Sequence, residues 1–236
     1  MYEEHPVFNP PENENVKIWR YLDIPKFLWL LERKSLYFPR CDLLGDPFEG
    51  SLPSTSSQPI IKPLNDPKLP KMFSSLEDMW RKDCFICSFH MSDYESAALW
   101  SVYTKAKQGV AIQSTFKRLV DCFNNYHLSP VYIGMVNYID YKSEIIDISN
   151  SFSPILHKRK SFEHERELRA VILYPYGSPT QPEGLNVKIK LDSLIESIYL
   201  APTTKPWIIE LLSSMMRKNR IKKPLEQSSL DAKPII

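Results

Sequence analysis

The feature that most constrains this chain is a dense run of charge that leads directly into an apolar segment. Residues 163–169 read Glu-His-Glu-Arg-Glu-Leu-Arg, and Ala-Val-Ile-Leu-Tyr follows over 170–174. Charged groups are costly to bury unless they are paired or used. The run is therefore either an ion-pair network or the edge of a working site. The ion-pair interpretation is favoured, because structural networks gather charge in this way.

Period-two geometry decides which of these side chains share a face. If a strand begins at Glu167, residues 167, 169 and 171 project to one face and residues 168, 170 and 172 to the other. Glu167 and Arg169 would then lie side by side, with Glu165 as a neighbour. Residues 154–166 are expected to form a helix, with Lys158–Lys160 mostly solvated.

Composition excludes several classes of protein. The chain has 236 residues, 43% of them hydrophobic and 25% charged, which is typical of a globular protein. A net charge of +2 is too small to indicate binding to nucleic acid or to a membrane surface. Only 6 residues are glycine and no GxGxxG or Walker motif occurs, so a glycine-rich phosphate loop is nearly excluded.

The sequence also indicates a compartment. No secretory signal is recognisable near residue 1, and the apolar run 27–31 is too short to span a bilayer. The expected location is the cytoplasm. Its reducing conditions would keep the four cysteines, Cys41, Cys84, Cys87 and Cys122, as free thiols.

The expected elements are interleaved helices and strands. A loose arm is expected over 1–15 and a single globular domain over 16–236, in which the proline-rich residues 51–70 form a surface loop that could serve as a lid. Strands are predicted over 16–21, 35–38, 84–90, 108–114, 130–141, 167–174, 186–191 and 197–200. Helices are predicted over 24–33, 76–81, 116–123, 154–166 and 206–217. This order predicts an α+β fold with a mixed, largely antiparallel sheet and flanking helices.

Two helix starts have capping signals. Asp23 is placed to cap the helix over 24–33. Ser92–Glu95 fits the S/T-x-x-E capping box, and the helix after it would carry Ser96, Trp100 and Tyr103 on one face. These three are either ordinary core packing or a platform on which a planar ligand stacks, and the two interpretations have equal weight.

Cys84-x-x-Cys87-x-x-His90 has the spacing of a metal motif. In a strand, however, Cys84 and Cys87 project to opposite faces, whereas zinc needs four converging ligands. Buried thiols in a core strand are favoured, and no structural zinc is expected.

The segment from Leu43 to Gly50 contains a turn at Asp46-Pro47, bracketed by two of the few glycines. Asp46 and Glu49 could face a pocket. The favoured alternative is a turn in which the Asp46 side chain accepts backbone N–H bonds.

Several of these pieces together resemble a known family. They are Trp19-Arg20-Tyr21-Leu22, Asp46–Gly50, Cys87–His90, Trp100-x-x-Tyr103, Gly109–Ile112, Lys160-x-Phe162-x-x-Glu165-x-Glu167-x-Arg169 and Ile198–Pro202. In this combination the chain resembles a bacterial family catalogued only as a domain of unknown function, number 2971. That name implies relatives but no activity.

A second resemblance suggests an activity. Arg20 on an early strand, Tyr103 or Ser96 in the middle and Glu167 opening a late strand follow the residue order of ADP-ribosyltransferase-like proteins. This resemblance implies NAD as the ligand. Arg20 would hold the pyrophosphate, the aromatic residue would stack on nicotinamide, and Glu167 would stabilise a cationic transition state. Further candidate binding residues are Ser96, Trp100, Arg169, Glu165, Asp46 and Glu49.

Two other hypotheses remain open. The chain could be a non-catalytic accessory module in bacterial defence or a toxin–antitoxin system, with its charged motifs buried in mutual salt bridges. It could also be a magnesium-dependent hydrolase that uses a set of four carboxylates, Asp46, Glu49, Glu165 and Glu167. The hydrolase ranks last, because the flanking arginines would weaken cation binding.

Overall fold

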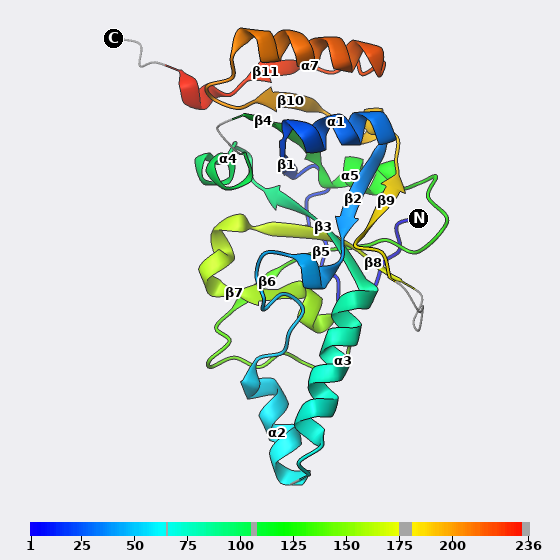
Figure 1. Cartoon of the computed structure of the whole chain (residues 1–236), viewed down its shortest axis with the longest axis vertical. Coiled ribbons are helices and arrows are strands. Elements are labelled where there is room, and N and C mark those ends of the chain that lie inside the picture. Colours follow the sequence, from blue (N-terminus) through cyan, green and yellow to red (C-terminus); the bar gives the residue numbers. More distant parts are fainter. Residues whose placement is uncertain (65, 105–107, 175–180, 233–236) are drawn as a thin grey trace.

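The computed structural model describes residues 1–64, 66–104, 108–174 and 181–232. In this part of the chain the main sheet has seven strands in the order β11-β10-β4-β1-β3-β8-β5 (Figure 1). The strands are β1 (Lys17–Asp23), β3 (Cys84–Met91), β4 (Gly109–Thr115), β5 (Tyr132–Met135), β8 (Glu167–Leu173), β10 (Ser197–Leu200) and β11 (Leu225–Gln227). Only the β10–β11 pair is parallel among them, so the predicted α+β fold with a largely antiparallel sheet is confirmed.

Helices and two small sheets flank the main sheet. The helices are α1 (Ile24–Arg33), α2 (Ser54–Leu64), α3 (Leu69–Asp83), α4 (Ala97–Tyr103), α5 (Phe116–Cys122), α6 (Leu191–Leu194) and α7 (Pro206–Lys218). The small sheets pair β2 (Ser35–Pro39) with β9 (Gly184–Lys188), and β6 (Asn137–Ile139) with β7 (His157–Arg159). Short 3-10 turns complete the fold at η1 (Cys41–Leu43), η3 (Ser153–Leu156), η4 (Lys160–Glu165) and η5 (Ser229–Asp231). Within the described residues, none of the helices combines the length and the apolar character that a membrane span needs.

The sheet is divided at its centre. β1 pairs with β4 over seven residue pairs, from Lys17 to Asp23, and β3 pairs with β8 over seven, from Cys84 to His90. β1 and β3 pair only at Ile18↔Met91 and Trp19↔His90. Beyond these two pairs the ladder between β1 and β3 stops, which leaves an opening between two otherwise well-paired parts of the sheet.

The two faces of the sheet bury different clusters, as the period-two pattern predicts. Leu168, Ala170 and Ile172 join the large core that also contains side chains of α1, α5 and α7. Val171 joins a second cluster on the other face. Cys84 belongs to this second cluster and Cys87 to the large core, so the two thiols project to opposite faces as expected.

The predicted start of α1 is confirmed. The Asp23 side chain accepts a hydrogen bond from the backbone N–H of Lys26 at 2.8 Å. Pro25 stands in the first turn, where its missing N–H costs no helical hydrogen bond. The helix ends at Arg33, and Lys34 follows as its C-cap with a left-handed backbone and φ of 49°.

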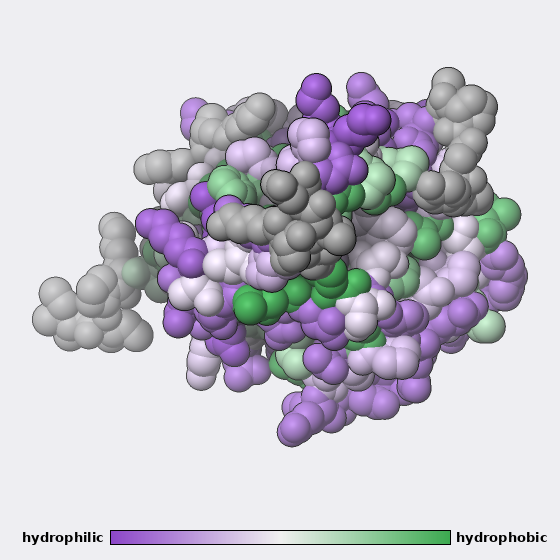
Figure 2. All heavy atoms as spheres, turned by 90° about the horizontal axis from the view of Figure 1, so that it is seen from below, coloured by the Kyte–Doolittle hydropathy of each residue, from purple (hydrophilic) through white to green (hydrophobic). Residues whose placement is uncertain are grey.

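The prediction of a surface loop over 51–70 is wrong. α2 and the start of α3 occupy this segment, and the two helices extend away from the sheet (Figure 1). Contacts with a distant segment hold α2 in place despite its prolines: Ser56 Oγ accepts from the Ile146 N–H at 2.8 Å, and Thr55 donates to the Glu144 carbonyl. The surface seen from this end is mostly hydrophilic, with small scattered apolar areas (Figure 2).

The predicted helix over 154–166 is also wrong. The segment forms η3, the short strand β7 and η4, because β7 pairs with β6 and extends the backbone at Lys158. Lys158 is consequently buried and not solvated as expected. A left-handed Arg166, with φ of 39°, then turns the chain into β8.

The capping box at Ser92 does not form. Ser92 Oγ accepts from the nearby Tyr94 N–H, and α4 begins only at Ala97 with Ser96 as its N-cap. The reason lies outside the helix, because the Glu95 carboxylate accepts hydrogen bonds from Ser228 and Ser229 instead.

Other expected boundaries shift. The long strand over 130–141 breaks at Val136 into β5 and β6, and residues 186–191 contain the end of β9 and the start of α6. The expected N-terminal arm contacts the sheet edge, since Tyr2 forms a β-bridge with Val131 and Phe8 is buried.

A candidate active site in the divided sheet

A cavity of about 700 Å³ lies where β1 and β3 part. It is lined from both strands, by residues 19–22 of β1 and residues 88–90 of β3, and also by α1, β2 and the turn at 43–45. Most of the lining is apolar. Among the ionisable groups of the lining, five with the chemistry for binding or catalysis come from four segments of the chain: Arg20, His90, Tyr103, Glu165 and Glu167. An apolar pocket with a few convergent polar groups is the usual form of a small-molecule site.

Arg20 bridges the opening in the sheet. Its Nη1 donates to the Ser88 carbonyl at 2.7 Å and its Nη2 to the Tyr37 carbonyl at 3.4 Å. The guanidinium also lies 5.5 Å from the centre of the Phe89 ring. Among the described residues no carboxylate lies within ion-pair distance of Arg20, so its charge remains available to an anion in the cavity.

Below the cavity, the charged run forms a buried ion-pair network. Lys158 Nζ lies 2.6 Å from Glu165, 2.7 Å from Glu167 and 3.0 Å from Glu49. Arg169, which is 0% exposed, pairs with Glu167 at 2.9 Å and donates to the Ile155 carbonyl at 2.6 Å. Its Nη2 also lies 2.8 Å from Glu49 Oε2, an ion pair without hydrogen-bond geometry.

The network contains three carboxylates and two cations, and this imbalance separates the pKa values of the two glutamates that line the cavity. Burial, together with a hydrogen bond to Glu167, raises the pKa of Glu165 to about 7. Burial acts in the same direction on Glu167, but the adjacent Arg169 and Lys158 outweigh it and hold the pKa of Glu167 well below its usual range. A proton on Glu165 leaves the network neutral. Paired groups with pKa values pushed apart are a frequent acid–base arrangement.

Tyr103 reaches the same site from α4. It is 44% exposed, and its ring lines the cavity. Burial of its hydroxyl and the nearby Glu165 and Glu167 carboxylates raise the pKa of Tyr103 to about 12. The hydroxyl therefore remains protonated at neutral pH and can donate a hydrogen bond to a ligand.

The other two residues of the predicted stacking platform lie elsewhere. Ser96 caps α4 by accepting from the Leu99 N–H, and Trp100 is buried with its indole N–H donated to Glu95 at 2.9 Å. Neither residue lines the cavity. The structure brings Tyr103 to the cavity and uses Ser96 and Trp100 to hold the helix.

Asp46 sits in the expected turn. Its Oδ1 accepts from the Phe48 N–H at 3.0 Å, as the favoured interpretation predicts, and also pairs with Arg159 at 2.7 Å. Gly50 closes the turn with φ of +68°, where an added Cβ would lie 2.8 Å from Cys41 Sγ. The turn needs glycine at this position because a side chain fits neither the backbone nor the space.

The four carboxylates proposed for magnesium do not gather around one point. Asp46 pairs with Arg159, whereas Glu49, Glu165 and Glu167 are held by Lys158 and Arg169. In the described part of the chain no three His, Cys, Asp or Glu side chains are placed to hold a metal ion.

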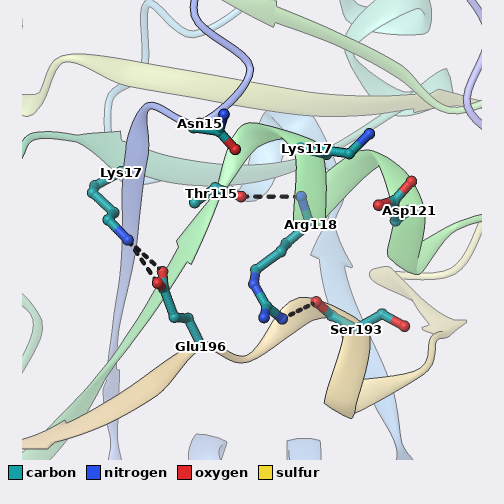
Figure 3. Close-up of a pocket in the computed structure, with 8 residues that line it drawn as sticks. All are labelled: Asn15, Lys17, Thr115, Lys117, Arg118, Asp121, Ser193 and Glu196. Atoms are coloured by element: carbon teal, nitrogen blue, oxygen red, sulfur yellow. Dashed lines mark hydrogen bonds and ion pairs between the residues drawn. The ribbon is translucent and has the colours of Figure 1, made fainter.

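A second pocket, of about 530 Å³, is lined by polar residues (Figure 3). Its cations are already engaged. Lys17 pairs with Glu196 at 2.7 Å, and Arg118 donates to the Ser193 carbonyl at 2.9 Å. Lys117 lies 3.7 Å from Glu14. These contacts join β1 and α5 to the segment around α6, and α5 to the residues before β1, and they give the second pocket a structural role.

One residue at the cavity escaped sequence reasoning as a functional candidate. His90 drew attention only as a metal ligand, yet it lines the cavity as the cross-strand partner of Glu167. Pairing β3 with β8 from the sequence would have placed the two side chains together, because opposite residues of neighbouring strands project to the same face.

Comparison with known proteins gives one match. Residues 99–170 match the family described as "Protein of unknown function (DUF2971)". Neither the curated proteins nor the solved structures yield a match to this chain. The matched segment runs from α4 through the charged run into β8, and so carries Tyr103, Lys158, Glu165, Glu167 and Arg169. The comparison thereby confirms, over residues 99–170, the resemblance to this family of unknown function.

Proposed function

We propose that the cavity binds a dinucleotide of the NAD type and that the protein cleaves the bond between nicotinamide and ribose, as ADP-ribosyltransferase-like enzymes do. One observation carries the proposal: Arg20, Tyr103 and Glu167 come from three separate segments and line the same cavity. Since NAD is an intracellular nucleotide, we place the activity in the cytoplasm.

Arg20 is suited to the pyrophosphate. A guanidinium can donate two parallel hydrogen bonds to phosphate oxygens. Two donations to backbone carbonyls already fix the orientation of Arg20, and its remaining N–H groups are available to a ligand. Because the surrounding lining is largely apolar, the attraction between Arg20 and an anion is stronger here than at an open surface.

The glutamate pair is suited to the reacting ribose. Cleavage of a nicotinamide–ribose bond passes through a transition state with cationic character at the sugar. Ionised Glu167, held by Lys158 and Arg169, supplies a fixed negative charge near the cavity, and fixed charges that need no rearrangement stabilise such a state best. Glu165 lines the same cavity, where its carboxyl group can hydrogen bond to a ribose hydroxyl.

The aromatic residues of the lining are suited to the planar rings of the substrate. Tyr103, Tyr37 and Trp29 all line the cavity and remain between 40% and 45% exposed. Trp29 is fixed by a hydrogen bond to Asn186 at 3.0 Å and by Arg33 over its ring. Rings held in this way can stack on nicotinamide or adenine.

The test is nicotinamide release, measured by chromatography, with NAD-induced thermal shift as the binding readout. We expect NAD to raise the melting temperature of the wild type, and Glu165→Gln to bind NAD but to lower kcat by about 100-fold or more. Arg20→Gln should raise KM, whereas Arg118→Gln, in the second pocket, should leave KM and kcat unchanged. A wild type with neither a thermal shift nor nicotinamide release would refute the proposal.

The buried network favours a second candidate function, a non-catalytic accessory module of a bacterial defence or toxin–antitoxin system. In that case the buried network of Glu49, Lys158, Glu165, Glu167 and Arg169 is a determinant of the fold. Glu165→Gln then alters stability and has no effect on activity, because the protein has none. The nicotinamide assay separates the two candidates, because only the first predicts turnover by the wild type.

A further inference from the structure

His90 stands at the point where the sheet divides. On one side it pairs with Trp19 of β1, and the pairing of β3 with β1 stops at this position. On its other side it pairs with Glu167 of β8. The residue is only 8% exposed and lines the cavity. Its imidazole is therefore buried against the site and not part of the outer surface.

One contact fixes the form of the ring. His90 Nδ1 lies 2.7 Å from the backbone carbonyl oxygen of Glu165. A carbonyl can only accept, so Nδ1 must carry the hydrogen. In a neutral imidazole the other nitrogen, Nε2, then has a free lone pair. Within the described residues no hydrogen bond to Nε2 is found, although the residue is only 8% exposed.

The groups around His90 keep it neutral. Burial is the main cause that lowers the pKa of His90, and the nearby Arg166 and His164 on the η4 side lower it further. The hydrogen bond to Glu165 acts in the opposite direction but is outweighed. Across the ladder, Glu167 from β8 is ionised but hydrogen bonds to Lys158 and Arg169, and Trp19 from β1 carries no charge.

Glu167 is poorly placed to accept another proton. Both oxygens of Glu167 accept hydrogen bonds, one from Lys158 and Arg169 and the other from Arg169. Glu165 accepts a hydrogen bond from Lys158 through Oε2, and the proposed function gives its carboxyl group to a ribose hydroxyl. Nε2 of His90, in contrast, has a free lone pair, and within the described residues no donor contacts it at the cavity.

We propose that Nε2 of His90 accepts the proton of the nucleophile, water or an acceptor hydroxyl, that attacks the ribose carbon. This inference rests on the proposed NAD-cleaving function. In the hydrolytic reaction the bond between C1′ and the nicotinamide nitrogen breaks, and its electron pair neutralises the ring of the leaving group. The water oxygen forms the new bond to C1′. Its proton passes to Nε2 and then to solvent, which leaves ADP-ribose, nicotinamide and one proton.

Two variants test this role. His90→Asn keeps a side-chain amide that can donate to the Glu165 carbonyl but lacks a basic nitrogen at Nε2. His90→Ala removes the ring and leaves a space that free imidazole can fill. For each, kcat and KM for nicotinamide release are measured with NAD, together with the NAD-induced thermal shift.

We expect His90→Asn to lower kcat by about 100-fold with KM within twofold, since general base catalysis contributes at least this much. Both variants should keep the NAD thermal shift, and added imidazole should restore the rate of His90→Ala at least tenfold, in a saturable way. A structural role predicts no rescue. The role of His90 alone is overturned if His90→Asn turns over NAD within threefold of the wild-type rate. It is also overturned if His90→Ala binds NAD but imidazole does not restore its rate. An inactive wild type overturns the NAD-cleaving function as well.

Discussion

At the scale of single residues, the charged run is held together by one ammonium and one guanidinium group. Lys158 and Arg169 each contact more than one carboxylate, so neither cation can be lost without leaving buried negative charge. Burial alone would lower the pKa of Lys158, but the adjacent Glu167 and Glu49 outweigh it and raise that pKa. The lysine is therefore charged at neutral pH.

Lys158→Met should destabilise the fold by about 3–5 kcal/mol, because it leaves three carboxylates facing a buried methyl group. Urea denaturation followed by circular dichroism measures the free energy of unfolding. The matched control is Lys160→Met, two residues along at an exposed position, for which we expect a change within about 0.5 kcal/mol. Equal effects of the two substitutions would contradict a structural role for the network.

Glu165 should make stability depend on pH. Its pKa is raised from 4.5 to about 7 in the folded protein, so the folded state binds more protons than the unfolded state between these values. The contribution of Glu165 to the free energy of unfolding should therefore decrease as pH rises from 4.5 to about 7 and then level off. Glu165→Gln should flatten this part of the profile, measured as melting temperature against pH; a profile unchanged by the substitution would count against the shifted pKa.

At the scale of elements, the sequence predicted what depends on neighbouring residues and missed what depends on distant ones. The cap at Asp23 and the alternating faces of β8 are local patterns, and both are confirmed. α2 forms although it contains prolines, because the segment around Ile146 hydrogen bonds to it. β7 forms because β6 pairs with it. Of the candidate site, Arg20, Tyr103 and Glu167 followed from resemblance, whereas His90 required the register of β3 on β8.

The Glu95 side chain connects the segment after β11 to the start of α4. The Glu95 carboxylate accepts from Ser228, Ser229 and Trp100. Glu95→Gln should lower the free energy of unfolding by about 1.5–3 kcal/mol, the range for hydrogen bonds to a charged group. Asp93→Asn, at an exposed position in the same turn, serves as the control and should change stability little. Increased hydrogen exchange at Ser229 in Glu95→Gln, but not in Asp93→Asn, would locate the effect.

At the scale of the whole molecule, the divided sheet raises the question of whether its two parts unfold separately. They share one large core, because strands from both sides of the opening and helices α1, α5 and α7 all contribute to it. The division between β1 and β3 is therefore a local opening that makes room for the cavity and not a boundary between folding units.

We accordingly expect a single cooperative transition. Urea unfolding followed by tryptophan fluorescence should coincide with unfolding followed by far-UV circular dichroism, with the same midpoint and slope. The tryptophans report on several regions: Trp19 lies at the opening, Trp80 on α3 and Trp207 on α7. Separate midpoints for the two probes would show that the parts of the sheet unfold independently.

The mutual dependence of Glu49, Lys158 and Arg169 has an evolutionary consequence. Because Glu49 pairs with both cations inside the protein, we expect a substitution of one member to be tolerated only when a partner changes as well. Related sequences should therefore show correlated replacement at these positions. Glu49 and Lys158 lie more than a hundred residues apart in the chain. A relative that has exchanged Arg169 for an apolar residue should have lost the acidic residue at position 49 in the same lineage.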